Sequence, residues 1–206
     1  MNLVRSISLY CIYILNKGSN VHFFFSKQLH SLLGCGTGLA SLTVAKLGAA
    51  QVYATDGNEE VVRLAKSNID RNNLSSIVQS TKLQWGLLDA SEYTDTADIV
   101  IGSDLTYNSG SWRLLAETIS TILKTEGIFL YLSLGHPGFN VSGELDGFIA
   151  VAQNMGLVPL KEGSNKWPFQ KNAGSLRNMI QNRLTDEEQV IVEGTGGFRI
   201  LLFQKK

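Results

Sequence analysis

Three glycines alternate with other residues in the stretch Gly34-Cys35-Gly36-Thr37-Gly38, which separates a short apolar run from an apolar, helix-forming segment. Glycines at a strand-to-helix turn let a ligand approach the backbone, because no β-carbon stands in the way. Leu39 occupies the position where a dinucleotide fingerprint has its third glycine, which disfavours a nicotinamide or flavin pyrophosphate. No G-K-[ST] sequence follows, so a phosphate-binding P-loop is excluded. The turn therefore predicts a cofactor site of another kind.

An acidic residue, Asp56, ends the next expected strand, 22 positions after Gly34. At that place a carboxylate can accept hydrogen bonds from both ribose hydroxyls of an adenosine. In an alternative interpretation, the glycines only allow tight helix packing and Asp56 only caps the helix that follows. The turn, the apolar helix and the strand-end aspartate together favour the cofactor site.

Strands and helices alternate around these residues. The apolar patterns predict strands near 30–33, 51–55, 78–85, 98–104, 128–134, 157–161 and 198–204, and helices near 39–47, 59–71, 112–122, 145–155 and 175–183. Residues 124–127 read as a turn. Such alternation predicts a largely parallel α/β sheet with right-handed crossovers, whose ligands bind at the carboxyl ends of the strands.

The composition is that of a globular chain with one sizeable core. The 206 residues are 44% hydrophobic and carry a formal net charge of zero. Without a basic excess, we expect no nucleic-acid partner. Two cysteines, Cys11 and Cys35, are too few for a disulfide framework, which favours a reducing compartment.

The N-terminal segment departs from this regular pattern. Its apolar run, residues 7–15, has the length of a signal-peptide core and is too short to span a bilayer. No clear cleavage pattern follows it. We expect residues 1–28 to form an atypical leader that packs poorly, and residues 29–206 to form a single domain. A targeting segment, or a core or edge strand, are the alternatives.

The chain from Leu32 to Leu134 resembles the seven-β-strand S-adenosylmethionine-dependent methyltransferases. "LLGCGTGLASLTVAKLGA" is similar to their first motif, and "VYATDGNEEVVRLAKSNIDRNN" to the acidic strand end and helix that follow it. "LQWG", residues 83–86, and "DIVIGSDLTY", residues 98–107, are similar to the L-x-W-G and D-x-x-Y signatures of the protein-lysine methyltransferases in this class. The resemblance implies a doubly wound, mostly parallel, seven-stranded Rossmann-like sheet with an antiparallel last strand.

The same resemblance implies a site. S-adenosyl-L-methionine is the expected cofactor, and a protein that presents a lysine is the expected partner. No metal, no membrane association, a monomeric state and a cytoplasmic location are further expectations. Cofactor contacts are implied at Gly34, Cys35 and Gly36 for the methionine end, Asp56 for the ribose, Trp85 for the adenine and Ser103 for the pocket floor, while Asp104 and Tyr107 would face the methyl acceptor.

The residue types suit methyl transfer to an amine. A lysine has an ordinary pKa of about 10.4, and burial lowers that pKa by disfavouring the ammonium. Asp104 and Tyr107 can receive the ammonium and orient the amine after its proton leaves to water, so neither has to act as a base. A core aromatic at the end of a strand is the alternative for Trp85, and packing at a helix entrance is the alternative for Tyr107. Trp112 fits a core helix.

Two departures from the family pattern lie at or before residue 32. Leu32 stands where the first motif usually has an acidic residue, and no tryptophan precedes Trp85. The hypothesis that follows is a truncated or mis-joined leader on a methyltransferase core that binds the cofactor weakly. Methylation of RNA or of a small molecule, and an inactive binding or scaffold protein, are therefore kept as alternative functions. Residues 162–197 are the candidate segment for substrate choice.

Overall fold

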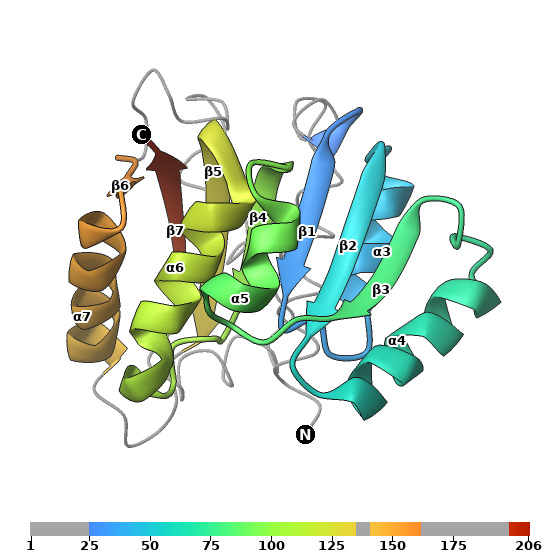
Figure 1. The fold of residues 1–206 in the computed structure, drawn as a ribbon, viewed down its shortest axis with the longest axis horizontal. Helices are drawn as coiled ribbons and strands as arrows, with labels where there is room; N and C mark the ends of the chain where they lie inside the picture. The colour runs from blue at the N-terminus through green and yellow to red at the C-terminus, as the bar shows by residue number, and fades with distance from the viewer. Residues whose placement is uncertain (1–24, 135–140, 162–197) are drawn as a thin grey trace, which may run out of the picture.

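A seven-stranded sheet forms the centre of the molecule, with helices on both of its faces (Figure 1). The computed structural model describes residues 25–134, 141–161 and 198–206. The strands are β1 (Leu29–Leu33), β2 (Gln51–Asp56), β3 (Val78–Lys82), β4 (Ala97–Ser103), β5 (Leu123–Leu134), β6 (Leu157–Pro159) and β7 (Phe198–Lys205). Their order across the sheet is β3-β2-β1-β4-β5-β7-β6.

The strand order reverses between β1 and β4. The chain winds outward from β1 through β2 to β3 and then returns to β4 on the other side of β1, with all these neighbours parallel. β5 continues the parallel part, whereas β7 runs antiparallel between β5 and β6. The mostly parallel sheet and its antiparallel last strand are thus confirmed, and the reversal point is where such sheets bind ligands.

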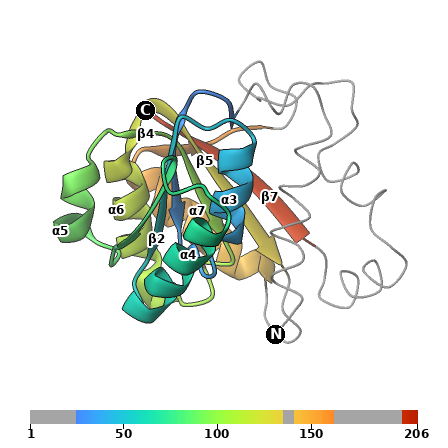
Figure 2. The same ribbon diagram turned by 90° about the vertical axis from the view of Figure 1, so that its right-hand side faces the viewer.

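The helices enclose two apolar cores, one on each face of the sheet. They are α3 (Leu39–Lys46), α4 (Glu59–Arg71), α5 (Leu87–Ala90), α6 (Trp112–Ile122) and α7 (Val141–Asn154), with short 3₁₀ turns at Ser91–Tyr93 and Ser109–Ser111. Side chains of α3 and α4 join one core, and those of α6 and α7 join the other. Figure 2 shows α3 across the sheet from α5 and α6. No helix in the described ranges is both long and apolar enough to cross a membrane.

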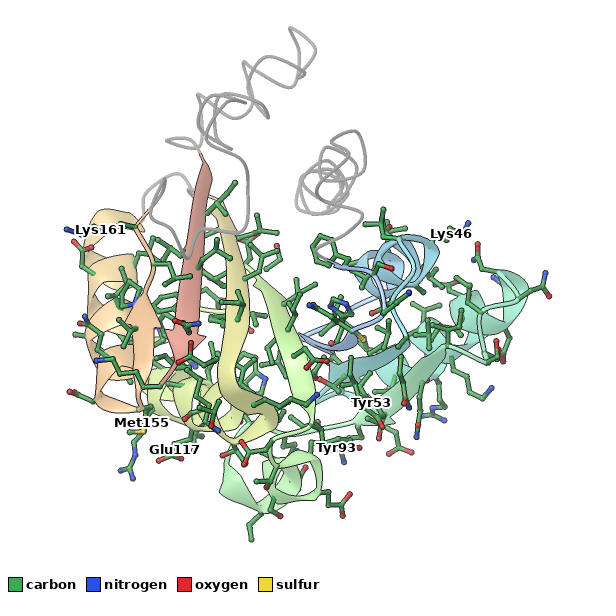
Figure 3. The ribbon with its side chains drawn as sticks, turned by 90° about the horizontal axis from the view of Figure 1, so that it is seen from above. Lys46, Tyr53, Tyr93, Glu117, Met155 and Lys161 are labelled. Carbon is green, nitrogen blue, oxygen red and sulfur yellow. The ribbon has the colours of Figure 1, made fainter. Side chains whose placement is uncertain are left out.

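Apolar side chains fill the space between the sheet and its helices, whereas charged side chains lie at the periphery. In Figure 3, Lys46, Glu117 and Lys161 mark that periphery. β4 is covered on both faces, because Ile99 and Ile101 join one core and Val100 joins the other. This double coverage explains why the strand reads as an unbroken apolar run.

The structure corrects three details of the sequence-based assignment. The third strand ends at Lys82 instead of continuing to Trp85. Residues 124–127, expected as a turn, lie inside β5, where the pairing with β4 shifts between Ala97 and Ile99. Glu126 has a φ of 66° within this irregularity, so the local backbone is turn-like although the strand continues through it. β6 ends at Pro159, and the helix expected at 175–183 lies outside the described residues.

Phe25 and His30 form a buried contact at the start of the described chain. Both side chains are fully buried, and His30 Nε2 donates a hydrogen bond to the Phe25 carbonyl oxygen over 2.9 Å. Phe25 belongs to the apolar core beneath α3. The expected domain boundary after residue 28 stays a prediction, but Phe25 itself is a core residue.

Burial lowers the pKa of His30 from its ordinary 6.5 to about 4, although the bond to Phe25 and the nearby Asp98 charge act in the opposite direction. As the pH falls from 6.5 towards 4, the unfolded chain therefore takes up a proton that the folded chain does not. We predict that this titration lowers the free energy of unfolding by about 3 kcal/mol over that range. Urea unfolding of the wild type and of His30→Gln at several pH values tests this prediction. The difference between their free energies of unfolding should shrink on acidification. Parallel pH profiles would contradict the prediction.

Candidate functional site

The glycine turn, residues 34–38, connects β1 to α3 at the carboxyl edge of the sheet. Gly34, Gly36 and Gly38 all have left-handed backbones, with φ of 60°, 56° and 82°. A β-carbon at Gly34 would lie 2.7 Å from Leu105 Cδ2, and one at Gly38 would lie 3.3 Å from Ala65 Cβ. At Gly36, by contrast, a β-carbon would meet nothing within 4 Å. Packing therefore accounts for the outer two glycines, while the α-carbon of Gly36 faces open space that a ligand could enter.

Asp56 supports the turn from the end of β2. Its Oδ2 accepts a hydrogen bond from Gly36 N over 3.2 Å, and its Oδ1 accepts one from Asn58 N over 3.0 Å. Asn58 in turn caps α4 by accepting a bond from Glu60 N. Asp56 thus takes part in the start of the next helix, as the alternative interpretation proposed, and also lies against the turn, as the cofactor interpretation requires.

Further hydrogen bonds fix the turn to its surroundings. Cys35 N donates to the Thr55 carbonyl oxygen over 2.8 Å, and Asn68 Nδ2 of α4 donates to the Thr37 carbonyl oxygen over 2.9 Å. The Thr55 hydroxyl donates to the Leu32 carbonyl oxygen over 2.8 Å. The turn is therefore preorganised by β2 and α4 without any ligand.

Ser103 and Asp104 lie at the end of β4, next to the glycine turn across the reversal point. Ser103 is half-buried and pairs with Leu132 of β5. Asp104 has a φ of 52°, a left-handed backbone that aspartate tolerates better than most residues, and its N–H donates to the Leu132 carbonyl oxygen. Unusual backbone geometry of this kind is concentrated at functional sites.

Residues 104–107, here called the post-β4 loop, connect Asp104 to Tyr107. Leu105 packs against the glycine turn, because β-carbons at Gly34 and at Gly102 would each lie 2.7 Å from its methyl groups. Tyr107 is 69% exposed, which leaves its hydroxyl accessible to a second molecule. Packing at a helix entrance, the alternative considered for Tyr107, does not fit this exposure.

Trp85 follows β3 at the same edge of the sheet. It is half-buried and packs against the core beneath α6 and α7. The preceding segment stays next to β2, since Leu83 N donates to the Asp56 carbonyl oxygen over 3.0 Å, and Gly86 N then donates to Thr118 Oγ1 of α6 over 2.8 Å. Trp85 thus packs against the core and stays half-buried at the carboxyl edge of the sheet.

Hydrogen bonds and packing bring together Gly34, Gly36, Asp56 and the post-β4 loop, and Trp85 follows the neighbouring strand. Sequence reasoning missed Leu105 and Tyr131. Tyr131 Oη accepts hydrogen bonds from the N–H groups of Leu105 and Thr106. The signal for Tyr131 was a tyrosine within the apolar run of a buried strand, because a buried hydroxyl requires a partner.

Leu32 is a core residue. Its side chain is 2% exposed and joins the apolar cluster beneath α3.

Among the described residues, no three histidine, cysteine, aspartate or glutamate side chains gather as a metal site would require.

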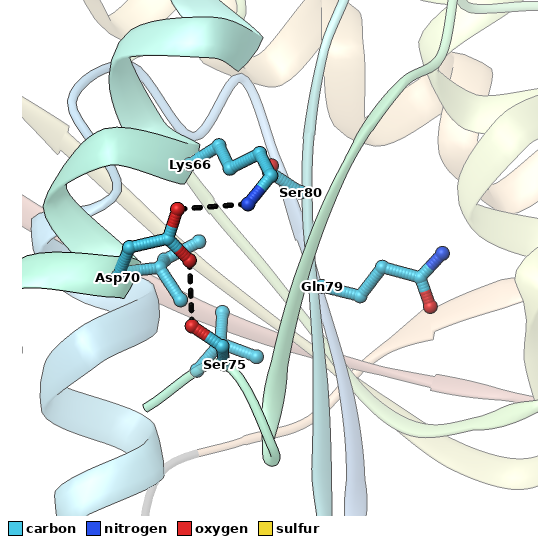
Figure 4. A pocket seen from close by; sticks show the side chains of 7 residues that line it. Lys66, Asp70, Ser75, Gln79 and Ser80 are labelled. Atoms are coloured by element: carbon cyan, nitrogen blue, oxygen red, sulfur yellow. Dashed lines mark hydrogen bonds and ion pairs between the residues drawn. The ribbon is translucent and has the colours of Figure 1, made fainter. Parts of the chain in front are cut away.

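A shallow cavity of about 270 Å³ lies at the other end of the sheet, between α4 and β3 (Figure 4). Its lining includes Val78 and Ser80 from the amino-terminal half of β3. Its charged groups pair with each other, because Lys66 Nζ lies 2.8 Å from Asp70 Oδ2 and Ser75 donates to Asp70 Oδ1. The cavity is therefore separate from the carboxyl edge and is not the candidate site.

Solved structures share the fold of this chain. A putative sarcosine dimethylglycine methyltransferase from Galdieria sulphuraria superimposes with a TM-score of 0.66 and 15% identity, covering 98% of this chain and 88% of that one. Geranyl diphosphate C-methyltransferase from Streptomyces coelicolor A3(2), bound to S-adenosyl-L-homocysteine, gives a TM-score of 0.58 and 12% identity, covering 97% and 76%. The fold is therefore that of the Rossmann-like methyltransferases.

The family follows from the sequence comparison. A model of the family described as "Lysine methyltransferase" matches residues 5–135, so the chain belongs to that family. A calmodulin-lysine N-methyltransferase of Arabidopsis thaliana is 38% identical over 98 residues, which are 46% of this chain and 32% of that protein. A ribosomal protein L11 methyltransferase of Alkaliphilus metalliredigens is 34% identical over 98 residues, 48% of this chain and 29% of that protein. The chain spans about a third of the length of these relatives.

The Cys35 thiol is a partly buried group of the turn. Burial, with the Asp56 charge as a second cause, raises the pKa of its thiol from 9.0 to about 12. Because the thiolate is the nucleophile, we predict that iodoacetamide alkylates Cys35 at pH 8 about a thousandfold more slowly than an ordinary thiol. A Cys11→Ser background isolates the signal, and the same protein in guanidinium chloride is the control. Alkylation of the folded chain at the rate of the unfolded control would contradict this.

Proposed function

We propose that this protein transfers a methyl group from S-adenosylmethionine to a lysine side chain of a protein substrate. The observation that carries the proposal is the single edge at which open space at Gly36, the Asp56 carboxylate and the post-β4 loop meet. Membership of the lysine methyltransferase family supports the same reaction. The monomeric state and the cytoplasmic location stay predictions.

The cofactor half of the proposed site lies along the ends of β1, β2 and β4. The turn residues Gly34, Cys35 and Gly36 would surround the methionine end, and Asp56 would accept hydrogen bonds from the ribose hydroxyls. Trp85 would border the adenine and Ser103 the floor of the pocket. One oxygen of Asp56 already accepts from Gly36, so the same carboxylate would support both the turn and the ribose.

The acceptor half would be the post-β4 loop. When bound, S-adenosylmethionine supplies a methyl group on an activated sulfonium, so the chain has to align the amine and exclude water. Asp104 would receive the lysine ammonium, and the exposed Tyr107 hydroxyl would orient the amine after its proton leaves to water. Burial of the lysine lowers its pKa and so favours the neutral amine.

An inactive binding protein is the second candidate function, and Leu32 favours it. The family's usual carboxylate at this position contributes to holding the cofactor's amino group, and a buried leucine offers no such charge. This candidate expects weak or absent cofactor binding, whereas the proposed function requires binding.

Removal of the Asp56 charge should weaken cofactor binding. We predict that Asp56→Asn raises the Kd for S-adenosylmethionine about 10- to 100-fold in isothermal titration, because charge-assisted hydrogen bonds to the ribose are lost. Asp70→Asn is the matched control, since Asp70 lies on the same helix-strand layer but pairs only with Lys66 and Ser75 at the surface. Its Kd should stay within about twofold of the wild type.

The same titration separates the two candidate functions. Micromolar binding by the unsubstituted 206-residue chain would contradict the inactive protein with a weakened site. An absence of binding at millimolar cofactor would contradict the proposed enzyme. Equal effects of Asp56→Asn and Asp70→Asn would show that Asp56 has no role at the ribose.

Incubation of the full chain with radiolabelled S-adenosylmethionine and a whole-cell lysate should label a protein band. Acid hydrolysis of that band should release methylated lysine. We predict that Asp104→Asn reduces the label about tenfold or more, because a neutral amide attracts the ammonium less strongly. Asparagine tolerates the left-handed backbone at position 104, which limits damage to the fold. Asp146→Asn, at an exposed position of α7, is the control.

The place where label appears discriminates among the alternatives. Label in RNA or in the small-molecule fraction would contradict a protein substrate. Label in arginine or histidine of the protein would contradict lysine as the acceptor. No label in any fraction would favour the inactive protein.

A further inference from the structure

Tyr131 of β5 holds the post-β4 loop by its hydroxyl. The side chain is fully buried. Its Oη accepts hydrogen bonds from Leu105 N at 3.1 Å and Thr106 N at 3.3 Å, and it lies 2.9 Å from Thr106 Oγ1. Two successive backbone N–H groups that converge on one oxygen restrict the backbone between them. One buried hydroxyl therefore restrains two successive residues of this loop.

Trp112 holds the same loop from the opposite side of Thr106. Its indole Nε1 donates to the Thr106 carbonyl oxygen over 2.8 Å. The ring is itself fixed against α7, because a β-carbon at Gly147 would lie 2.5 Å from it. Thr106 is thus held at its N–H, its hydroxyl and its carbonyl by residues of β5 and α6.

The two ends of the loop carry the residues proposed to meet the acceptor. Asp104 begins it, with its N–H on the Leu132 carbonyl of β5, and Tyr107 ends it with an exposed side chain. Thr106 lies between them, so the anchor at Tyr131 restrains the loop that carries both residues. The glycine turn has separate anchors at Thr55 and Asp56, so its geometry does not depend on Tyr131.

We propose that Tyr131 is a positioning residue, whose hydroxyl fixes the post-β4 loop so that Asp104 and Tyr107 meet the acceptor amine. It sets the turnover number without contributing to cofactor affinity. This inference rests on the proposed function. Tyr131 is too deeply buried to touch a protein substrate, so it acts through the loop.

The Tyr131 hydroxyl stays protonated. Burial raises the pKa of Tyr131, and the nearby Asp104 charge acts in the same direction. The group therefore stays neutral at physiological pH and serves as a fixed hydrogen-bond partner.

Tyr131→Phe tests the proposal, because phenylalanine keeps the ring that packs on Phe129 and Phe148 and removes only the hydroxyl. With the protein labelled in the lysate experiment as substrate, kcat should fall about 10- to 100-fold. The Kd for S-adenosylmethionine should stay within about twofold. Thr106→Val should lower kcat in the same direction, and Thr106→Ser, which keeps the hydroxyl, should restore it.

Tyr93→Phe is the matched control. The Tyr93 hydroxyl lies 3.5 Å from Thr81 Oγ1, and its ring is edge-on to Tyr53 with the centroids 5.4 Å apart. Figure 3 shows these two tyrosines together beside the β2–β3 side of the sheet. Loss of this hydroxyl should leave both kcat and cofactor affinity unchanged.

Hydrogen exchange gives a readout that does not depend on activity. In Tyr131→Phe, peptides that cover residues 103–111 should exchange faster, while those that cover residues 34–38 should not change. Unchanged exchange in the loop, an unchanged kcat, or equal losses of kcat and cofactor affinity would each overturn the proposal. A wild type that methylates no protein would instead contradict the proposed function, and the exchange result would still decide whether Tyr131 fixes the loop.

Discussion

Close packing of Leu105 against Gly34 and Gly102 joins the two halves of the site. Each of these glycines lies so near the leucine that a β-carbon would come within 2.7 Å of it. Gly34 belongs to the glycine turn and Gly102 to β4, and the two strand ends are neighbours because Leu33 pairs with Gly102. This packing keeps the post-β4 loop next to the turn, while the turn keeps its own hydrogen bonds to Thr55 and Asp56.

The two halves of the site, the glycine turn and the post-β4 loop, are fixed by different elements of the fold. The turn is fixed by β2 and α4, through the carbonyl of Thr55, the carboxylate of Asp56 and the amide of Asn68. The post-β4 loop is fixed by β5 and α6, through the hydroxyl of Tyr131 and the indole of Trp112. Leu105 belongs to the loop and packs against the turn. This division allows cofactor binding and acceptor placement to be altered separately by substitution, although both occur at one edge of the sheet.

Most of the fold could be predicted from local sequence patterns, whereas the features that depend on contacts between distant elements could not. The apolar run of β4 and the left-handed glycines of the turn are properties of a few adjacent residues. The sequence of residues 124–127 predicts a turn, and Glu126 does have a left-handed backbone there, but the pairing of Leu123 with Ala97 places these residues within β5. The strand before Trp85 ends early for a similar reason, since Gly86 is bound to Thr118 of α6. The role of Leu105 could not be predicted from the sequence, because leucine has no reactive group. The role depends on packing against two glycines that are distant from it in the sequence or belong to another element.

Leu32 changes the cofactor site less than its position in the motif suggests. In the family pattern a carboxylate at this position supports both the turn and the cofactor's amino group. Here the turn is supported without it, because Gly36 donates to Asp56 and Cys35 donates to Thr55, whose hydroxyl returns to the Leu32 carbonyl. The leucine side chain meanwhile packs in the core beneath α3, where an unpaired carboxylate would be destabilising. The departure therefore removes one contact to the proposed cofactor and leaves the geometry of the turn intact.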